Sequence, residues 1–156
     1  MKPISVSTTI DRPRAEVYAH LDVLGNHPSF LDHFMADAVL SGPPSGIGAH
    51  LRFRVLSPGR TEWMESTVMA TEPDVSITEQ TLGAGGKRRM RGTYRLADAH
   101  ADGRATRVTF ELVTESAPAL ERLLAPLTRS WLAKQNVRAM ARLKEQLESE
   151  SAAAAA

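Results

Sequence analysis

Two side chains of this sequence, Glu79 and Tyr94, have the chemistry and the expected placement for acid–base work inside a protein. Glu79 shares the two-residue alternation of Val75 and Ile77 in a predicted strand, so its carboxylate is expected to point inward with them. A carboxylate withdrawn from water holds a proton more readily and can act as a general acid or base. Tyr94 lies on the same predicted face as Met90 in the next strand and would offer a hydroxyl to a bound carbonyl or phenol. If the protein is an enzyme, these two residues are its predicted catalytic groups.

Both residues also have a structural interpretation, which the pattern leaves open. Glu79 stands near the end of its strand, where a bulge would turn it toward water. A tyrosine on an apolar face is often a core residue whose hydroxyl is hydrogen-bonded. The sequence therefore identifies two candidates without deciding between catalysis and packing.

Metal and cofactor sites are not expected. The five histidines fall on separate predicted elements and lack the i, i+4 pairing of helix-borne metal ligands. They are His20, His27, His33, His50 and His100. His27 stands near a predicted helix start, where histidines are usually solvated; the alternative is that it reaches the mouth of an interior cavity. No dinucleotide or Gly-x-Ser-x-Gly motif is present, and the glycine-rich loop 83–86 lacks the adjoining helix that a phosphate site needs.

Residues 87–91 contain the basic cluster of the chain. Within and beside it, Arg89, Arg91 and Arg95 are expected to share the outer face of a strand and to pair with Glu111 of the neighbouring strand. It contains no interleaved aromatic residues, which single-stranded nucleic-acid sites use as stacking platforms. The net charge of the chain is only +1, and charges of both signs alternate along it. We therefore expect no nucleic-acid partner.

Length and composition limit the fold that must position these residues. With 156 residues and no cysteine, the chain is expected to form one domain over residues 1–148 without disulfides. Residues 149–156, mostly alanine, are expected to be a disordered tail. No segment approaches the ~18 apolar residues of a membrane span, and the N-terminal residues lack a signal-peptide pattern. We expect a cytoplasmic protein without membrane insertion, as a monomer or homodimer.

Hydrophobic periodicity divides the chain into an opening strand, two short helices, a run of strands and a final helix. Alternation predicts the opening strand over 4–10, and helical spacing predicts the two short helices before residue 35. Six further strands are expected over about 37–41, 51–55, 61–71, 75–82, 88–96 and 107–112, separated by turn residues. From Pro118 to Leu147 an apolar stripe of helical period predicts one long helix, kinked at Pro126.

This order of elements resembles the START-like (SRPBCC, Bet v-like) superfamily, and within it the polyketide cyclase/dehydrase and lipid-transport branch. The match covers almost the whole chain. Its phrases are Ile4–Ile10 leading to Arg12-Pro13, Leu24-Gly25-Asn26-His27-Pro28-Ser29-Phe30, Ser41-Gly42-Pro43-Pro44-Ser45-Gly46-Ile47-Gly48, Glu62-Trp63, Glu72-Pro73-Asp74 and Leu143-Lys144-Glu145-Gln146-Leu147-Glu148. The resemblance implies an α+β helix-grip fold, in which a seven-stranded curved antiparallel sheet wraps around a long C-terminal helix. It also implies a ligand cavity between the sheet and that helix.

A cavity is also expected because the few aromatic residues cannot easily fill the space that a curved sheet and one helix enclose. Gly92, in mid-strand, would leave room there or mark a bulge. The predicted ligand-binding residues are Phe30, Phe34, Phe53, Trp63, Met90, Phe110, Leu127 and Trp131. The pattern does not decide which face of strand 61–71 points inward, because Trp63 and Met64 lie on opposite faces. Ligand access is expected between residues 26–34 and the loop 83–87.

The function favoured by the sequence is binding of a hydrophobic small molecule, such as a polyketide, lipid or quinone-like compound. The alternative is a cofactor-independent cyclase, aromatase or dehydratase that moves protons with Glu79 and Tyr94. The cavity arginine and dense tryptophans of related aromatase/cyclases have no clear counterpart around Glu62-Trp63, which weakens this alternative. A macromolecular regulator would need an exposed apolar patch, and none is predicted among the outward positions.

Overall fold

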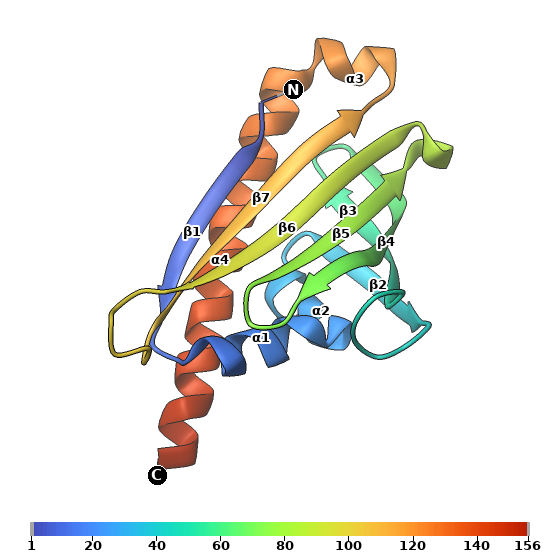
Figure 1. The fold of residues 1–156 in the computed structure, drawn as a ribbon. Helices are drawn as coiled ribbons and strands as arrows, with labels where there is room; N and C mark the ends of the chain where they lie inside the picture. Colours follow the sequence, from blue (N-terminus) through green and yellow to red (C-terminus); the bar gives the residue numbers. More distant parts are fainter. Residues whose placement is uncertain (1, 156) are drawn as a thin grey trace.

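The computed structural model describes residues 2–155 as a seven-stranded antiparallel sheet curved around one long helix (Figure 1). The strands are β1 (Ile4–Ile10), β2 (Met35–Ser41), β3 (His50–Ser57), β4 (Arg60–Glu72), β5 (Ser76–Gly83), β6 (Arg88–Asp98) and β7 (Thr106–Ser116). The helices are α1 (Arg14–Asp22), α2 (His27–Leu31), α3 (Ala119–Leu123) and α4 (Ala125–Ala155), with 3-10 turns η1 (Leu24–Asn26) and η2 (Ala84–Gly86). The predicted α+β helix-grip fold is confirmed, including the short helices between the first two strands.

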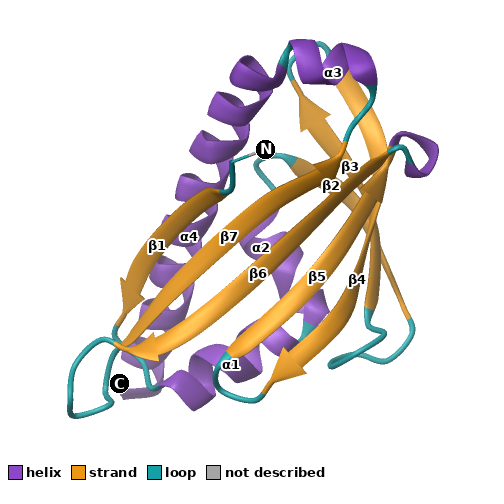
Figure 2. Cartoon of the chain, turned by 45° about the horizontal axis from the view of Figure 1, so that its top comes forward, coloured by secondary structure: helices purple, strands orange, loops and turns teal. Residues whose placement is uncertain are grey.

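The strand order is β1-β7-β6-β5-β4-β3-β2, so the first strand lies beside the last and the others form a meander. In the β1–β7 pair, Val6 lies opposite Phe110. Figure 2 looks onto the uncovered side of the sheet, with α4, α1 and α2 behind it. These three helices lie on the same side of the sheet, and the candidate interior lies between that side and α4.

Alternation along the strands sorts side chains between these two faces. On β6, Met90 and Tyr94 are buried on the face toward α4, which we call the inner face, while Arg91 and Arg95 are exposed on the outer face. On β4 the inner positions include Met64 and Val68, which are buried. This resolves the ambiguity of strand 61–71, because the residues directly before and after Met64 must point to the opposite, outer face.

The second half of α4 supplies the helix side of the core. Its apolar stripe buries Met140, Leu143 and Leu147. This part of the helix packs against β1 and α2, and the core cluster also contains Leu21 and Phe30 from the short helices. Burial of an amphipathic stripe stabilises a long helix more than its intrinsic propensity does.

The C-terminal helical region differs from the prediction of one helix kinked at Pro126. The helix is interrupted at Leu124, between α3 and α4, and not at Pro126. Pro126 instead occupies the first turn of α4, where the missing proline N–H removes no helical hydrogen bond, so a new helix start relieves the clash that a kink would retain. At its other end α4 continues to Ala155.

The helices of residues 2–155 do not include one that combines the length and apolar content required to span a bilayer.

Candidate functional site

Glu79 is the most unusual side chain of the inner face. It lies on β5 opposite Gly92 of β6 and Val68 of β4, and its side chain is only 12% exposed, which confirms the inward orientation. One carboxylate oxygen, Oε2, accepts a hydrogen bond of 3.2 Å from the Ser66 hydroxyl. The other, Oε1, is buried without a hydrogen-bond partner among residues 2–155. A buried oxygen in this state costs free energy unless a further group comes to it.

His27 faces this oxygen from the first residue of α2. The imidazole is buried, and its Nε2 lies 2.7 Å from the carbonyl oxygen of Leu21. A carbonyl can only accept, so Nε2 carries a proton. The second ring nitrogen, Nδ1, lies 3.5 Å from Glu79 Oε1, which is an ion-pair separation but longer than a normal hydrogen bond. Any proton exchanged between the two residues is therefore carried at Nδ1 or Oε1.

Tyr94 completes what we call the polar trio of His27, Glu79 and Tyr94. Its ring lies edge-on to His27 at 5.7 Å and against Phe110 at 4.6 Å. Burial raises the pKa of the Tyr94 hydroxyl well above its ordinary value, and the charge of Glu79 raises it further. Tyr94 is therefore protonated at neutral pH, so in this state it can donate a hydrogen bond but cannot act as a base.

Apolar side chains surround the trio on the inner face. Four of the predicted ligand contacts are here, all buried in the core cluster: Phe30, Phe53, Met90 and Phe110. Gly92 does not leave its space open for a ligand, because a Cβ at this position would lie 3.0 Å from two ring atoms of Phe110. The aromatic ring fills the space that the missing side chain leaves.

Two other predicted contacts lie outside this interior. Trp63 is on the outer face, 43% exposed, with the Arg52 guanidinium 4.3 Å from its ring centroid. The alternation that buries Met64 forces this outward direction. Leu127 is 72% exposed near the start of α4, where the sheet does not cover it. Trp131, one helical turn later, is half-buried and packs edge-on against the partly buried Phe34 at 6.0 Å.

The two hollows identified among the described residues do not include the expected open cavity between the inner face and α4. A hollow of about 430 Å³ lies at the end of the outer face, beside Val75 and Arg95. The inner face nevertheless keeps partly exposed positions along β3, β5 and β7, which are Val55, Thr81, Leu112 and Thr114. The interior is thus packed around the trio and less completely covered elsewhere.

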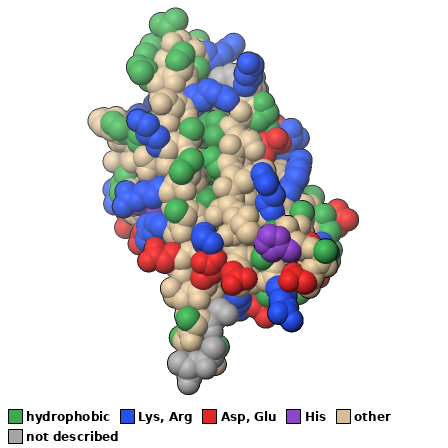
Figure 3. All heavy atoms as spheres, turned by 90° about the vertical axis from the view of Figure 1, so that its left-hand side faces the viewer, with side chains coloured by type: hydrophobic (Ala, Val, Ile, Leu, Met, Phe, Trp, Pro, Cys, Tyr) green, Lys and Arg blue, Asp and Glu red, His purple; other side chains and the backbone are tan. Residues whose placement is uncertain are grey.

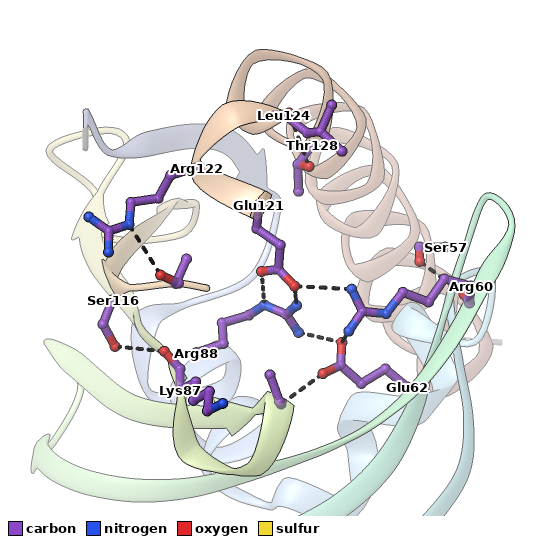
Figure 4. A network of polar contacts seen from close by, with 12 residues as sticks. Ser57, Arg60, Glu62, Lys87, Arg88, Ser116, Glu121, Arg122, Leu124 and Thr128 are labelled. Carbon is purple, nitrogen blue, oxygen red and sulfur yellow. Dashed lines mark hydrogen bonds and ion pairs between the residues drawn. The ribbon is translucent and has the colours of Figure 1, made fainter. Parts of the chain in front are cut away.

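A network of four charged residues connects α3 to the ends of the strands (Figure 4). Arg88 of β6 forms ion pairs with Glu62 of β4 and Glu121 of α3, and Arg60 contacts both carboxylates. Glu62 Oε1 also accepts a hydrogen bond of 2.7 Å from the backbone N–H of Ala84 in η2. The four-charge network thus links α3 to η2 through Arg88 and Glu62. The access route was expected between this loop and α2, and none of these four residues lies on α2.

The pKa values show how strongly these charges are coupled. Burial by itself would lower the pKa of Arg88, but its hydrogen bonds to Glu121 and Glu62 outweigh burial and raise it. Burial by itself would raise the pKa of Glu121, but the hydrogen bond and charge of Arg88, with those of Arg60, lower it. Both shifts favour the charged forms, so the network is intact at neutral pH.

Sequence patterns missed two members of the site. His27, expected in solvent, is buried because it is spaced three residues from Phe30, so that both point to the same side of α2. Ser66 is buried because it lies two residues from both Met64 and Val68 and therefore on the same inner face of β4. Within residues 2–155, no three histidine or carboxylate side chains converge in a way that could hold a metal ion.

Comparisons with known proteins relate this geometry to one family. A family model described as polyketide cyclase/dehydrase and lipid transport matches residues 1–148. No curated protein sequence matches the chain. The crystal structure of a protein from Thermus thermophilus is 18% identical, with a TM-score of 0.75, covering 96% of this chain and 99% of that one.

Two further solved structures share the fold. A protein of the dynemicin biosynthetic locus is 21% identical, with a TM-score of 0.61, and the match covers 96% of this chain and 48% of that one. Norcoclaurine synthase from Thalictrum flavum, in complex with dopamine and hydroxybenzaldehyde, is 13% identical, with a TM-score of 0.63 and coverages of 92% and 87%. At these identities the likeness shows the fold alone. The family model, however, extends over nearly the whole sequence, and the chain therefore belongs to the polyketide cyclase/dehydrase and lipid transport family.

Proposed function

We propose that the protein binds a hydrophobic small molecule that carries a polar group, in the interior between the inner face and α4. The observation that carries this proposal is the buried oxygen Oε1 of Glu79, which has no hydrogen-bond partner among the described residues. A hydroxyl of a ligand would satisfy this oxygen, and the protonated Tyr94 would donate to a ligand carbonyl or phenol. The apolar residues around the trio would hold the rest of the molecule.

Room for the ligand would come from movement of α3 and the first turns of α4. The partly exposed inner-face positions Leu112 and Thr114 lie on the strand that leads directly to α3. Opening this end breaks the ion pairs of Arg88, in which the side chains are only 13–19% exposed, but the separated charges return to water, which offsets much of the lost attraction. Opening the other end would expose Met140, Leu143 and Leu147, each contributing roughly 1.5–3 kcal/mol by burial. The α3 end is thus the less costly route into the interior.

Native mass spectrometry of protein purified from its own host tests this proposal. We expect a retained small molecule with an apolar body and a hydroxyl, phenol or carbonyl group. Retention should fall in Glu79→Gln and stay unchanged in Glu65→Gln, whose carboxylate is exposed on the same sheet. Protein that is free of any such compound, in repeated preparations, would contradict the proposal.

A second candidate is cofactor-independent acid–base catalysis on a polyketide-like substrate, as cyclase, aromatase or dehydratase. It is favoured by the His27–Glu79 pair. Because Nε2 of His27 donates a hydrogen bond to the Leu21 carbonyl, the second ring nitrogen, Nδ1, faces the Glu79 carboxylate. Glu79 or His27 would take a proton from an acidic carbon beside a carbonyl and return it to an oxygen. If so, Glu79→Gln should lower turnover about 10²–10⁴-fold while the substrate still binds. Equal turnover in mutant and wild type would remove Glu79 from the mechanism.

Location and assembly belong to the proposal. We propose a cytoplasmic protein that acts as a monomer or homodimer, because the chain contains no cysteine and the ligand would be held within one chain. Cell fractionation and sedimentation of the purified protein measure these two properties.

A further inference from the structure

Four leucines at one end of the molecule are exposed although their spacing is that of a buried helix face. In the sequence, Leu120, Leu123, Leu124 and Leu127 follow the i, i+3, i+4, i+7 pattern of an apolar stripe. In the structure they fall on α3, on the interruption at Leu124 and on the first turn of α4. Leu120, Leu123 and Leu127 are 70%, 78% and 72% exposed. We call these four residues the leucine tip. Single exposed leucines are common on protein surfaces, but a group of four at one end of a molecule marks a surface that meets something apolar.

The charges beside the leucine tip are predominantly positive. Its acidic neighbours, Glu62, Glu115 and Glu121, are each paired with arginine. Basic side chains at the same end have no acidic partner among residues 2–155. They are Lys2, Lys87, Arg89, Arg122 and Arg129. Arg122 lies on α3 itself, and Arg129 hydrogen-bonds to the backbone carbonyls of Lys2 and Pro3, which places the N-terminal segment at this end.

Figure 3 shows this polarity on the face formed by β1 and α4. Hydrophobic side chains gather at the end where α3 lies, lysine and arginine follow below them, and most acidic side chains of this face lie in the opposite half. An apolar tip bordered by free cations matches the boundary of an anionic bilayer, where acyl chains lie beneath negatively charged headgroups. A second copy of the chain would bring the same positive charges together.

We propose that the leucine tip docks on an anionic lipid surface, with its leucines in the acyl boundary and the neighbouring basic residues on the headgroups. Docking is peripheral, in keeping with the lack of a spanning helix in the described chain. The docked element is α3, the one that the four-charge network holds against the strands. The proposal is independent of any interior ligand, because the tip lies on the surface.

Co-sedimentation with vesicles tests the proposal on the ligand-free protein. We expect binding to vesicles of phosphatidylcholine mixed with phosphatidylglycerol, much weaker binding to phosphatidylcholine alone, and loss of binding as salt is raised. The double variant Leu120→Ser/Leu123→Ser should bind roughly tenfold to a hundredfold more weakly, since it removes two apolar anchors. The charge variant Lys87→Glu/Arg122→Glu should lose the preference for the anionic lipid.

The matched control is Leu40→Ser/Ile47→Ser, which removes two exposed apolar side chains near the start of β3. The α3 helix lies near the other end of that strand, beside Arg60. It should bind vesicles as the wild type does. Wild-type protein that stays in the supernatant, or equal loss in the control and the tip variant, would overturn the proposal. So would sedimentation showing a wild-type dimer that the tip variant breaks, without vesicle binding, because the tip would then join two copies.

Discussion

The two ends of the long C-terminal helical region use the same apolar stripe in opposite ways. Toward the C-terminal side, Met140, Leu143 and Leu147 are buried against β1 and the short helices. Toward the N-terminal side, Leu123 and Leu127 face solvent, and α3 is held to the strands by the four-charge network. One end is fastened by apolar burial, which is large and hard to reverse. The other is held by ion pairs whose charges would be solvated by water on opening, so that opening this end costs less free energy.

Within this helical region, the packed end contributes most of the stability, and the α3 end is the part that would move at lower cost. The packed end fixes α4 on the sheet and thereby fixes the position of α2, which carries His27. Movement of the α3 end would expose less buried apolar surface than movement of the packed end, and we propose it as the part of the fold that admits a ligand or meets a surface. Regions that open for function are generally drawn from the least stable parts of a structure.

The largest expected effect compares the same substitution at the two ends. Leu143→Ala should lower the free energy of unfolding by about 2–5 kcal/mol, because it leaves a cavity in the core. Leu127→Ala should change it by about 0.5 kcal/mol or less, because the side chain is already in solvent. Urea unfolding of both variants gives the values. Similar losses at both positions would show that the α3 end is packed as firmly as the core.

The next effect concerns the sheet between the two ends. Gly92→Ala should lower the free energy of unfolding by about 1–3 kcal/mol, because the new methyl group meets the Phe110 ring. Thermal unfolding measures the loss, and Phe110→Leu in the same background should recover part of it. A neutral Gly92→Ala substitution would show that the ring has more freedom than its contact with Tyr94 indicates.

Removing one charge should loosen α3 without loosening α4. Glu121→Gln should raise amide hydrogen exchange in residues 119–123 about 3- to 10-fold, because one partner of Arg88 loses its charge. Exchange in residues 139–147 should not change. Glu145→Gln, on an exposed position of α4, is the matched control. Faster exchange in both regions would mean that the two ends open together.

Acid should produce a smaller version of the same change. The pKa of Glu121 is lower in the folded protein than its ordinary value of 4.5. A depressed pKa adds stability that is present above 4.5 and is lost as the pH falls through the folded value. Exchange protection of α3, corrected for intrinsic rates, should therefore decrease below about pH 4.5 relative to that of α4. In Glu121→Gln this part of the pH dependence should be absent.

How far the sequence predicts this molecule depends on the range of the interactions involved. Strand alternation and helical spacing are local, so the seven strands and the inward direction of Glu79 and Tyr94 could be predicted. The side of strand 61–71 that faces inward depends on its neighbours, and Trp63 was placed wrongly for that reason. His27 was missed because a histidine at a helix start gives no sign that Leu21 will offer it a carbonyl.

Two further differences come from tertiary geometry. The stripe of residues 120–127 has the spacing of a buried face, but the sheet does not reach it, and no pattern within the helix reveals where its partner ends. Gly92 suggested space for a ligand, whereas the register brings Phe110 over it. Periodicity thus predicts which side chains can be buried, and the packing of distant elements decides which of them are.

The central claim, that the polar trio selects a ligand by its hydroxyl, is tested most directly with a pair of matched probes. Fluorescence titration would compare 2-naphthol with 2-methylnaphthalene, which has a methyl group in place of the hydroxyl. We expect the wild type to bind 2-naphthol more tightly, and Glu79→Gln to reduce that preference roughly tenfold, while Glu65→Gln retains it. Equal affinity for the two probes in the wild type, or a preference unchanged in Glu79→Gln, would contradict the account.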